Sequence, residues 1–171
     1  MTQLIPMISQ EEIKTKVRET GQKISFDYTG KDLVLAGILK GSFIFLADLT
    51  REITIDHKID LLGVSSYSGT SSTGEIRFTK KPDINIENKH VLLVEDIVDT
   101  GRTLSAIKEY VKSLNPASIK ICTLINKHER REIELHVDYA CFTLEKGFIV
   151  GYGLDYNELY RNLPAIFDLK L

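Results

Sequence analysis

The sequence has little that would mark a secreted, membrane-bound or disulfide-stabilised protein. Its two cysteines, Cys122 and Cys141, lie in apolar segments without the spacing of a metal site, so we expect reduced core residues. No stretch approaches the ~18 consecutive apolar residues that a membrane span requires. The amino terminus has no basic segment followed by an apolar run, so we expect no signal peptide and a cytoplasmic protein.

Neither sign of charge is in large excess. The 171 residues carry a net charge of −2 and no basic stripe, so we expect neither a nucleic-acid nor a membrane partner. The four histidines also lack metal-binding spacing. With 43% hydrophobic and 27% charged residues, the composition fits a single globular domain over residues 1–171.

Short apolar runs alternate with segments of helical periodicity. The runs of strand length occupy residues 33–39, 59–64, 91–94, 118–125, 137–142 and 148–152, of which the last should begin the final strand. Helical spacing of apolar residues occupies 13–28, 43–53 and 104–114, and a capping-box pattern at Ser9 precedes the first. This order predicts an α/β fold with a mostly parallel central sheet and helices on both faces.

The most informative segment is VLLVEDIVDTGRTL, residues 91–104. It joins a buried strand to the amino end of a helix, which is where ligands bind in open α/β sheets. Free backbone N–H groups and the helix dipole favour a phosphate there. Gly101 lets the backbone approach closely, and Thr100 and Thr103 add hydroxyl donors. This loop therefore predicts a phosphate site.

Three carboxylates in the same segment, Glu95, Asp96 and Asp99, would repel a phosphate on their own. A cation or a polyhydroxyl group has to lie between them, and Mg²⁺ commonly takes one or two carboxylates together with ligand oxygens. A sugar phosphate held with Mg²⁺ would account for both the phosphate-binding groups and the carboxylates of the segment. An ordinary strand–loop–helix junction with solvated acids is the alternative, and the clustering of the acids after a buried strand argues against it.

Residues 95–103, EDIVDTGRT, resemble the phosphoribosyl-pyrophosphate signature of the type I phosphoribosyltransferases. Further segments resemble the hypoxanthine/guanine branch of that family, namely 39–42, Ser66-Tyr67, Lys127 and 147–158. The resemblance covers nearly the whole chain. It implies the type I phosphoribosyltransferase fold, with a flexible hairpin loop and a small hood, and commonly a dimer or tetramer.

The resemblance also implies how the sugar phosphate is held. The phosphoribosyl group would contact Glu95, Asp96, Asp99, Thr100, Gly101, Arg102 and Thr103. Mg²⁺ would be held by Glu95, Asp96 and Asp155, and pyrophosphate by Lys40, Gly41 and Arg161. The peptide between Leu39 and Lys40 would be strained, and the family pattern allows it to be cis. Taken alone, Lys40 would be a solvated loop lysine, and Arg161 would form a surface ion pair.

The purine site follows from the same resemblance. Asp99 would be the general base near the purine nitrogen 7, Lys127 would donate to the 6-oxygen, and Phe148 would stack on the ring. Backbone groups from Ile149 to Asp155 would meet the 2-position. The alternatives are that Asp99 caps the following helix and that Phe148 is a core residue.

Two polar stretches are harder to interpret. Residues 65–74 are polar and small, so we expect a lid carrying Ser66 and Tyr67, followed by a hairpin arm at 75–79. A connection without a role is the alternative. Residues 128–132 are charged, and we expect a solvated face.

The resemblance implies a purine-salvage transferase that joins hypoxanthine or guanine to phosphoribosyl pyrophosphate. A ligand-sensing regulator with the same fold is a second hypothesis, but it should carry a basic nucleic-acid surface. A phosphoaccepting receiver domain is a third, because residues 93–96 resemble its acidic strand. Such acids should open the chain, whereas here ~90 residues precede them.

Overall fold

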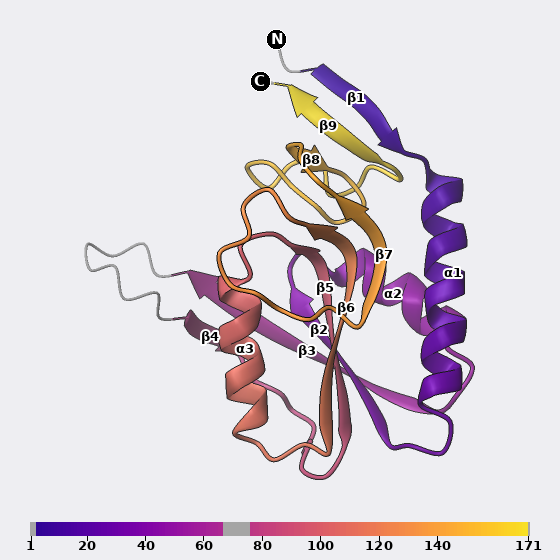
Figure 1. Ribbon diagram of the computed structural model, residues 1–171, viewed down its shortest axis with the longest axis vertical. Helices are drawn as coiled ribbons and strands as arrows, with labels where there is room; N and C mark the ends of the chain where they lie inside the picture. Colours follow the sequence, from indigo (N-terminus) through magenta and orange to yellow (C-terminus); the bar gives the residue numbers. More distant parts are fainter. Residues whose placement is uncertain (1–2, 67–75, 171) are drawn as a thin grey trace.

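Two sheets organise the computed structural model, which describes residues 3–66 and 76–170 (Figure 1). The larger sheet has the strand order β4-β3-β2-β5-β6-β7, and the smaller has the order β1-β9-β8. The strands of the larger sheet are β2(Leu33–Leu39), β3(His57–Ser66), β4(Ile76–Lys80), β5(His90–Val98), β6(Ser118–Lys127) and β7(Tyr139–Leu144). The strands of the smaller sheet are β1(Gln3–Ile8), β8(Ile149–Val150) and β9(Ile166–Lys170). The helices are α1(Gln10–Asp27), α2(Phe43–Glu52) and α3(Arg102–Lys112).

The predicted parallel sheet is confirmed. Strands β3, β2, β5, β6 and β7 pair in parallel, and only β4 runs antiparallel, against β3. The β3–β4 pair is the expected hairpin arm. Ser66 ends β3, whereas Tyr67 and the rest of the predicted lid lie outside the described residues.

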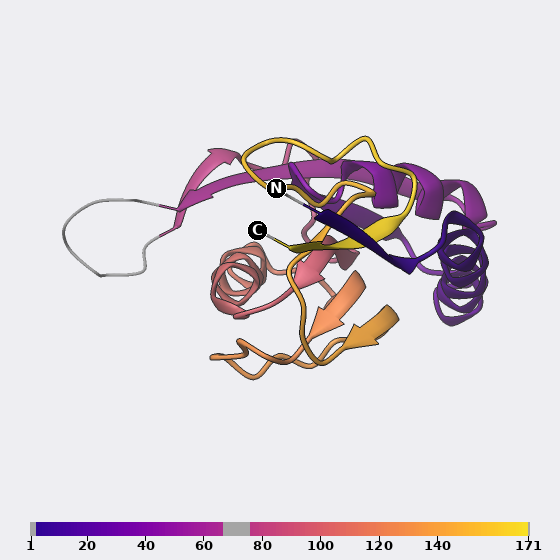
Figure 2. The ribbon, with the colours of Figure 1, turned by 90° about the horizontal axis from the view of Figure 1, so that it is seen from above.

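Alternating side chains on the central strands form two separate cores. Leu33 and Leu35 of β2 face α1 and α2, whereas Val34 and Ala36 face α3. The same alternation divides Leu92 from Leu93 in β5. Helices α1 and α2 consequently cover one face of the sheet and α3 the other, as expected for parallel strands buried on both faces (Figure 2).

Helix α1 begins as the sequence predicts. The Ser9 hydroxyl accepts from the Glu12 backbone N–H, and the Glu12 carboxylate accepts from the Ser9 N–H at 2.8 Å. Gly21 lies inside this helix because α2 passes very close: a Cβ there would come within 2.6 Å of the Glu52 Cβ. None of the helices in the described ranges 3–66 and 76–170 is long and apolar enough to cross a membrane.

The smaller sheet forms the expected hood, but the sequence predicted neither β1 nor β9. Strands β1 and β9 come from opposite ends of the chain and lie side by side above the larger sheet (Figure 1). Residues 148–152 do contain a strand, β8, but the prediction that it is the final strand is wrong. Strand β8 has two residues, and the chain returns through a loop to β9.

The boundaries around the acidic segment also differ from prediction. We expected the strand to end at Val94, but β5 continues to Val98, because its pairing with β6 extends to Val98 opposite Asn126. Glu95 and Asp96 therefore lie on a strand instead of a loop. Helix α3 starts at Arg102 after the N-cap residue Gly101, and the side chain that accepts from its first N–H is Thr100, at 3.4 Å, so Asp99 is not the helix cap.

Candidate active site

The predicted site residues meet at the carboxyl ends of β2, β5 and β6. The chain leaves β2 through α2 on one face and leaves β5 through α3 on the other, so the strand order reverses between these neighbours. Such a reversal leaves a crevice at the carboxyl ends, where ligands bind in open α/β sheets. Lys40 follows β2 at this point, and Glu95 and Asp96 lie near the end of β5.

Gly41 joins the end of β2 to the acids and to the hood. A Cβ on Gly41 would lie 1.7 Å from Asp96 Oδ2, and a Cβ on Gly153 would lie 2.1 Å from the Gly41 carbonyl oxygen. Gly153 has a φ of 100° and would clash with backbone, so only glycine fits there, whereas a side chain at position 41 would have to displace the Asp96 carboxylate. The peptide between Leu39 and Lys40 is cis, the form that the family pattern allows.

The two adjacent acids on β5, Glu95 and Asp96, both have raised pKa values. Burial raises the pKa of Glu95 well above its ordinary range, and the neighbouring Asp96 carboxylate raises it further. Burial also raises the pKa of Asp96, although hydrogen bonds and the nearby Arg161 oppose the shift. Two buried carboxylates that resist ionisation side by side fit a divalent cation, which would stabilise both charges. Among the described residues, no three His, Cys, Asp or Glu side chains form a metal cluster by themselves.

The loop between β5 and α3 surrounds a hollow of about 200 Å³ lined by residues 95–101, Thr103 and Leu104. Gly101 has a φ of 83°, and a Cβ there would come within 2.6 Å of the Ile133 carbonyl oxygen. The Arg102 side chain turns outward and pairs with Glu132. The predicted phosphate loop is therefore a cradle at a helix amino end, with Thr103 on its wall.

Lys127 and Asp99 face each other at the ends of β6 and β5. The Lys127 side chain is only 7% exposed, and its Nζ lies 3.9 Å from Asp99 Oδ1 and 3.1 Å from Glu129 Oε2. The Lys127 ammonium holds the pKa of Glu129 below its ordinary range. Asp99 Oδ1 is buried and has no hydrogen-bond partner within the described part of the chain. A buried oxygen of this kind is ready to accept a hydrogen bond from a ligand.

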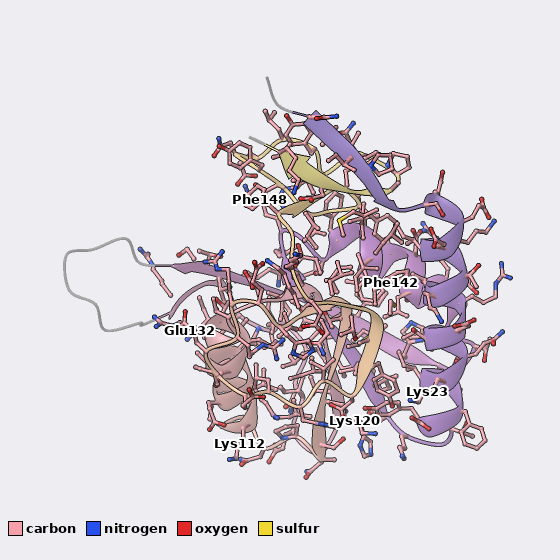
Figure 3. The ribbon with its side chains drawn as sticks, turned by 45° about the horizontal axis from the view of Figure 1, so that its top comes forward. Lys23, Lys112, Lys120, Glu132, Phe142 and Phe148 are labelled. Atoms are coloured by element: carbon pink, nitrogen blue, oxygen red, sulfur yellow. The ribbon has the colours of Figure 1, made fainter. Side chains whose placement is uncertain are left out.

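The other residues that were expected to contact the purine lie in the hood. The Phe148 ring is exposed and packs edge-to-face against Tyr156 at a centroid distance of 5.5 Å (Figure 3). The core alternative for Phe148 is therefore wrong. The Ile149 side chain is buried in the core, so only its backbone is able to meet a ligand.

Four charged side chains form a network on the far side of the crevice. Glu158 bridges Lys40 at 3.1 Å and Arg161 at 3.3 Å, and these two cations lower its pKa. Arg161 also pairs with Asp155 at 2.8 Å and donates to the Gly153 carbonyl at 2.7 Å. Lys40 and Arg161, the two cations that were predicted to bind pyrophosphate, are thus both paired with Glu158. Arg161 Nε is a buried donor without a partner among the described residues.

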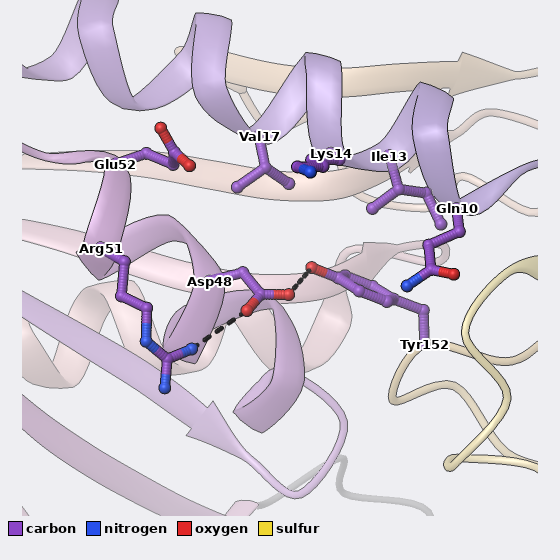
Figure 4. Close-up of a pocket in the computed structure, with 8 residues that line it drawn as sticks. All are labelled: Gln10, Ile13, Lys14, Val17, Asp48, Arg51, Glu52 and Tyr152. Carbon is purple, nitrogen blue, oxygen red and sulfur yellow. Dashed lines mark hydrogen bonds and ion pairs between the residues drawn. The ribbon is translucent and has the colours of Figure 1, made fainter.

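Tyr152 fastens this part of the hood to α2. Its hydroxyl donates to Asp48 at 2.6 Å, in a pocket between α1 and α2 that has a volume of about 270 Å³ (Figure 4). The Asp48 carboxylate also pairs with Arg51 (Figure 4). Tyr152 is thereby held beside Gly153, and the hood segment is fixed against the Gly41 loop.

The sequence did not reveal the part played by residues 128–132. They were expected to form a solvated face, but the Arg131 guanidinium donates to four acceptors at the ends of β5 and β6, so the expectation is wrong for this residue. Glu129 likewise contacts Lys127. Nothing in the local charge pattern distinguishes these two side chains from their solvated neighbours.

Comparisons with known proteins agree with this geometry. The phosphoribosyl transferase domain family matches residues 8–157. The chain is 45% identical to the hypoxanthine phosphoribosyltransferase of Escherichia coli (strain K12) over 94% of this chain and 92% of that protein. It is 46% identical to the hypoxanthine-guanine phosphoribosyltransferase of Streptococcus mutans, over 96% of this chain and 92% of that protein.

Comparison with solved structures points to the same family. A crystal structure of a hypoxanthine phosphoribosyltransferase from Staphylococcus aureus superposes with a TM-score of 0.92 at 45% identity, over 96% of this chain and 90% of that one. The hypoxanthine-guanine phosphoribosyltransferase of Bacillus anthracis gives a TM-score of 0.92 at 40% identity, over the full length of both chains. The receiver-domain hypothesis is therefore wrong. The chain belongs to the phosphoribosyltransferase family, in the branch of the hypoxanthine and hypoxanthine-guanine phosphoribosyltransferases.

Proposed function

We propose that the protein transfers the phosphoribosyl group of phosphoribosyl pyrophosphate to hypoxanthine or guanine, releasing pyrophosphate and forming IMP or GMP. The relatives' names support the reaction, and the site supports the assignment of individual residues. We expect a homo-oligomer, either a dimer or a tetramer, as is common in the family.

One observation carries the assignment of the purine end. A buried carboxylate oxygen without a hydrogen-bond partner in the described chain lies 3.9 Å from a buried ammonium, at Asp99 and Lys127. A 6-oxopurine presents nitrogen 7 and the 6-oxygen next to each other on one edge. Asp99 accepts the proton from nitrogen 7 as the new nitrogen–carbon bond forms, while Lys127 donates to the 6-oxygen.

The sugar and the leaving group occupy the other half of the crevice. The amide-lined hollow between β5 and α3 receives the 5′-phosphate, with Thr100, Gly101 and Thr103 around it. Glu95 and Asp96 bind the ribose hydroxyls and stabilise the positive charge that develops on the sugar ring in an oxocarbenium-like transition state. Lys40 and Arg161 attract the departing pyrophosphate once it displaces Glu158.

The paired acids of β5 support magnesium binding. Glu95 and Asp96 would hold one Mg²⁺, and Asp155 is the candidate ligand for a second. A bound Mg²⁺ supplies charge neutralisation on pyrophosphate. Asp155 would have to leave Arg161, with which it pairs at 2.8 Å in the structure.

A direct assay tests the proposal. The purified protein is incubated with phosphoribosyl pyrophosphate, Mg²⁺ and one base at a time, and the nucleotide and pyrophosphate are quantified by chromatography. Hypoxanthine and guanine should give IMP and GMP, and omission of Mg²⁺ should abolish turnover. No nucleotide from any base would overturn the proposal, and an RNA gel shift in that case would support the regulator hypothesis.

A further inference from the structure

Arg131 makes an unusual set of contacts beside the crevice. It lies in the loop after β6, and the N–H groups on Nε and Nη2 of its half-buried guanidinium reach four acceptors. Nε donates to the Asp99 carbonyl at 2.9 Å. Nη2 contacts the Val98 carbonyl at 3.0 Å, the Lys127 carbonyl at 2.9 Å and the Asn126 side-chain oxygen at 2.7 Å. None of these acceptors is a carboxylate, so the contacts do not form a surface ion pair.

The acceptors lie where two paired strands separate. The β5–β6 ladder ends at Val98 opposite Asn126, and the next residue on each strand is a site residue, Asp99 or Lys127. Val98 is the last residue of β5 that pairs with β6, Asp99 lies beyond the strand, and Lys127 keeps its pairing with Leu144 of β7 but has none with β5. The β5–β6 ladder therefore supplies no further hydrogen bonds at this end. The planar, fixed fork of an arginine is suited to bonding several backbone carbonyls at once, and each bond to its charge is stronger than a neutral one.

We infer that Arg131 is a positioning residue of the transfer reaction: its guanidinium fixes the spacing between the Asp99 carboxylate and the Lys127 ammonium. The inference rests on the proposed function, because the spacing matters only if both groups contact one purine edge. Arg131 itself touches neither the base nor the sugar in this scheme. Its loss should therefore affect the purine half of the reaction and spare the phosphoribosyl half.

The neighbouring Arg130 differs from Arg131 in its exposure and in its contacts. Its side chain is 63% exposed, and its one charged contact is with Asp99 Oδ2 at 3.5 Å. Within the described chain, Arg130 makes no hydrogen bond to the end of a strand. A lysine at position 131 would keep the charge, but one nitrogen with three donors in tetrahedral geometry is unable to replace the planar fork.

The test compares Arg131→Lys and Arg131→Gln with Arg18→Gln as a matched control. Arg18 lies on α1, away from the crevice, and its ion pair with Glu52 is loose at 3.9 Å. Melting temperatures fix an assay temperature at which every variant is folded. Steady-state kinetics then give kcat and KM for hypoxanthine, adenine and phosphoribosyl pyrophosphate separately.

Arg131→Lys should lower kcat/KM for hypoxanthine at least tenfold and narrow the preference over adenine, with KM for phosphoribosyl pyrophosphate changed less than twofold. Arg18→Gln should match the wild type. Unchanged kinetics in Arg131→Lys would overturn the inference, as would a uniform loss of active enzyme with both KM values and the base preference intact. If Arg131→Gln does not fold, Arg131→Lys decides the question alone.

A second measurement tests the role of the guanidinium directly. Arg131→Ala assayed with added free guanidinium, at millimolar concentrations below those that denature the protein, should regain part of its hypoxanthine activity, because the ion can occupy the vacated site. An absence of rescue in folded Arg131→Ala would count against the inference. An inactive wild type would overturn the proposed function itself, whereas an active wild type with normal Arg131 variants would overturn this inference alone.

Discussion

Replacing Lys127 with alanine tests the proposed base selection most directly. Lysine has only donors, the 6-oxygen of hypoxanthine or guanine is an acceptor, and adenine carries a donor amine at the same position. The Lys127 side chain is 7% exposed, so water cannot substitute for a missing partner. In the wild type, adenine would leave the ammonium facing another donor, and a site of this kind can reject the wrong analogue by ~10⁴ or more.

The size of the effect follows from the buried contact. A hydrogen bond to a charged group contributes about 1.5–3 kcal/mol, so Lys127→Ala should lower kcat/KM for hypoxanthine by roughly 10- to 150-fold. Activity with adenine should stay the same or rise, because the donor–donor conflict disappears. The preference for hypoxanthine should narrow by at least about tenfold.

The fold should survive this substitution. The anions that face Lys127 are Glu129 and Asp99, whose side chains are 45% and 25% exposed, so neither becomes a fully buried, unpaired charge. Lys112→Ala is the matched control, because Lys112 is 71% exposed on α3 and lies far from Phe148 (Figure 3). Thermal melts should give closely similar transitions for the wild type and both variants.

The assay measures kcat/KM for hypoxanthine, guanine and adenine with saturating phosphoribosyl pyrophosphate and Mg²⁺. Wild-type protein that uses adenine as readily as hypoxanthine would refute the assignment of Lys127 to the 6-oxygen. So would a Lys127→Ala variant whose preference among the bases is unchanged.

Three further substitutions separate the remaining roles. Asp99→Asn should keep the KM for phosphoribosyl pyrophosphate and lower kcat by ~10²–10⁴, the usual contribution of a general base, and near-normal kcat across pH would exclude that role. Glu158→Gln should lower the KM for phosphoribosyl pyrophosphate, by at most about fivefold because the Lys40–Glu158 ion pair is exposed. An increased KM would show that Glu158 does not compete with pyrophosphate for the cations. Burial and Asp96 raise the pKa of Glu95 in the folded protein, so stability is lost as the pH rises from the unfolded pKa through the folded pKa. Glu95→Gln should therefore raise the melting temperature of the metal-free protein at neutral pH, and the gain should shrink toward pH 4; calorimetry that shows no gain at neutral pH would contradict the electrostatic account.

Local patterns in the sequence determined the main elements and the residue types of the site. The capping box at Ser9 and the apolar run at 33–39 are encoded within a few residues, so periodicity and turn chemistry reveal them. The segment at 95–103 likewise carries its acids, glycine and hydroxyls in one contiguous stretch. Such signals need no knowledge of the rest of the chain.

Tertiary structure alone decided which distant residues meet. Strands β1 and β9 are short, and in neither do buried and exposed residues alternate strictly, so neither has a strong pattern of its own. Strand β1 depends on β9 for its hydrogen bonds, and β9 pairs with β1 and β8. Strand β5 continues beyond Glu95 and Asp96 because β6 pairs with it as far as Asn126. Arg131 looks like one charge in a charged run until the fold places the ends of β5 and β6 beside it. Contacts of this kind depend on long-range packing, which no local segment of the sequence records.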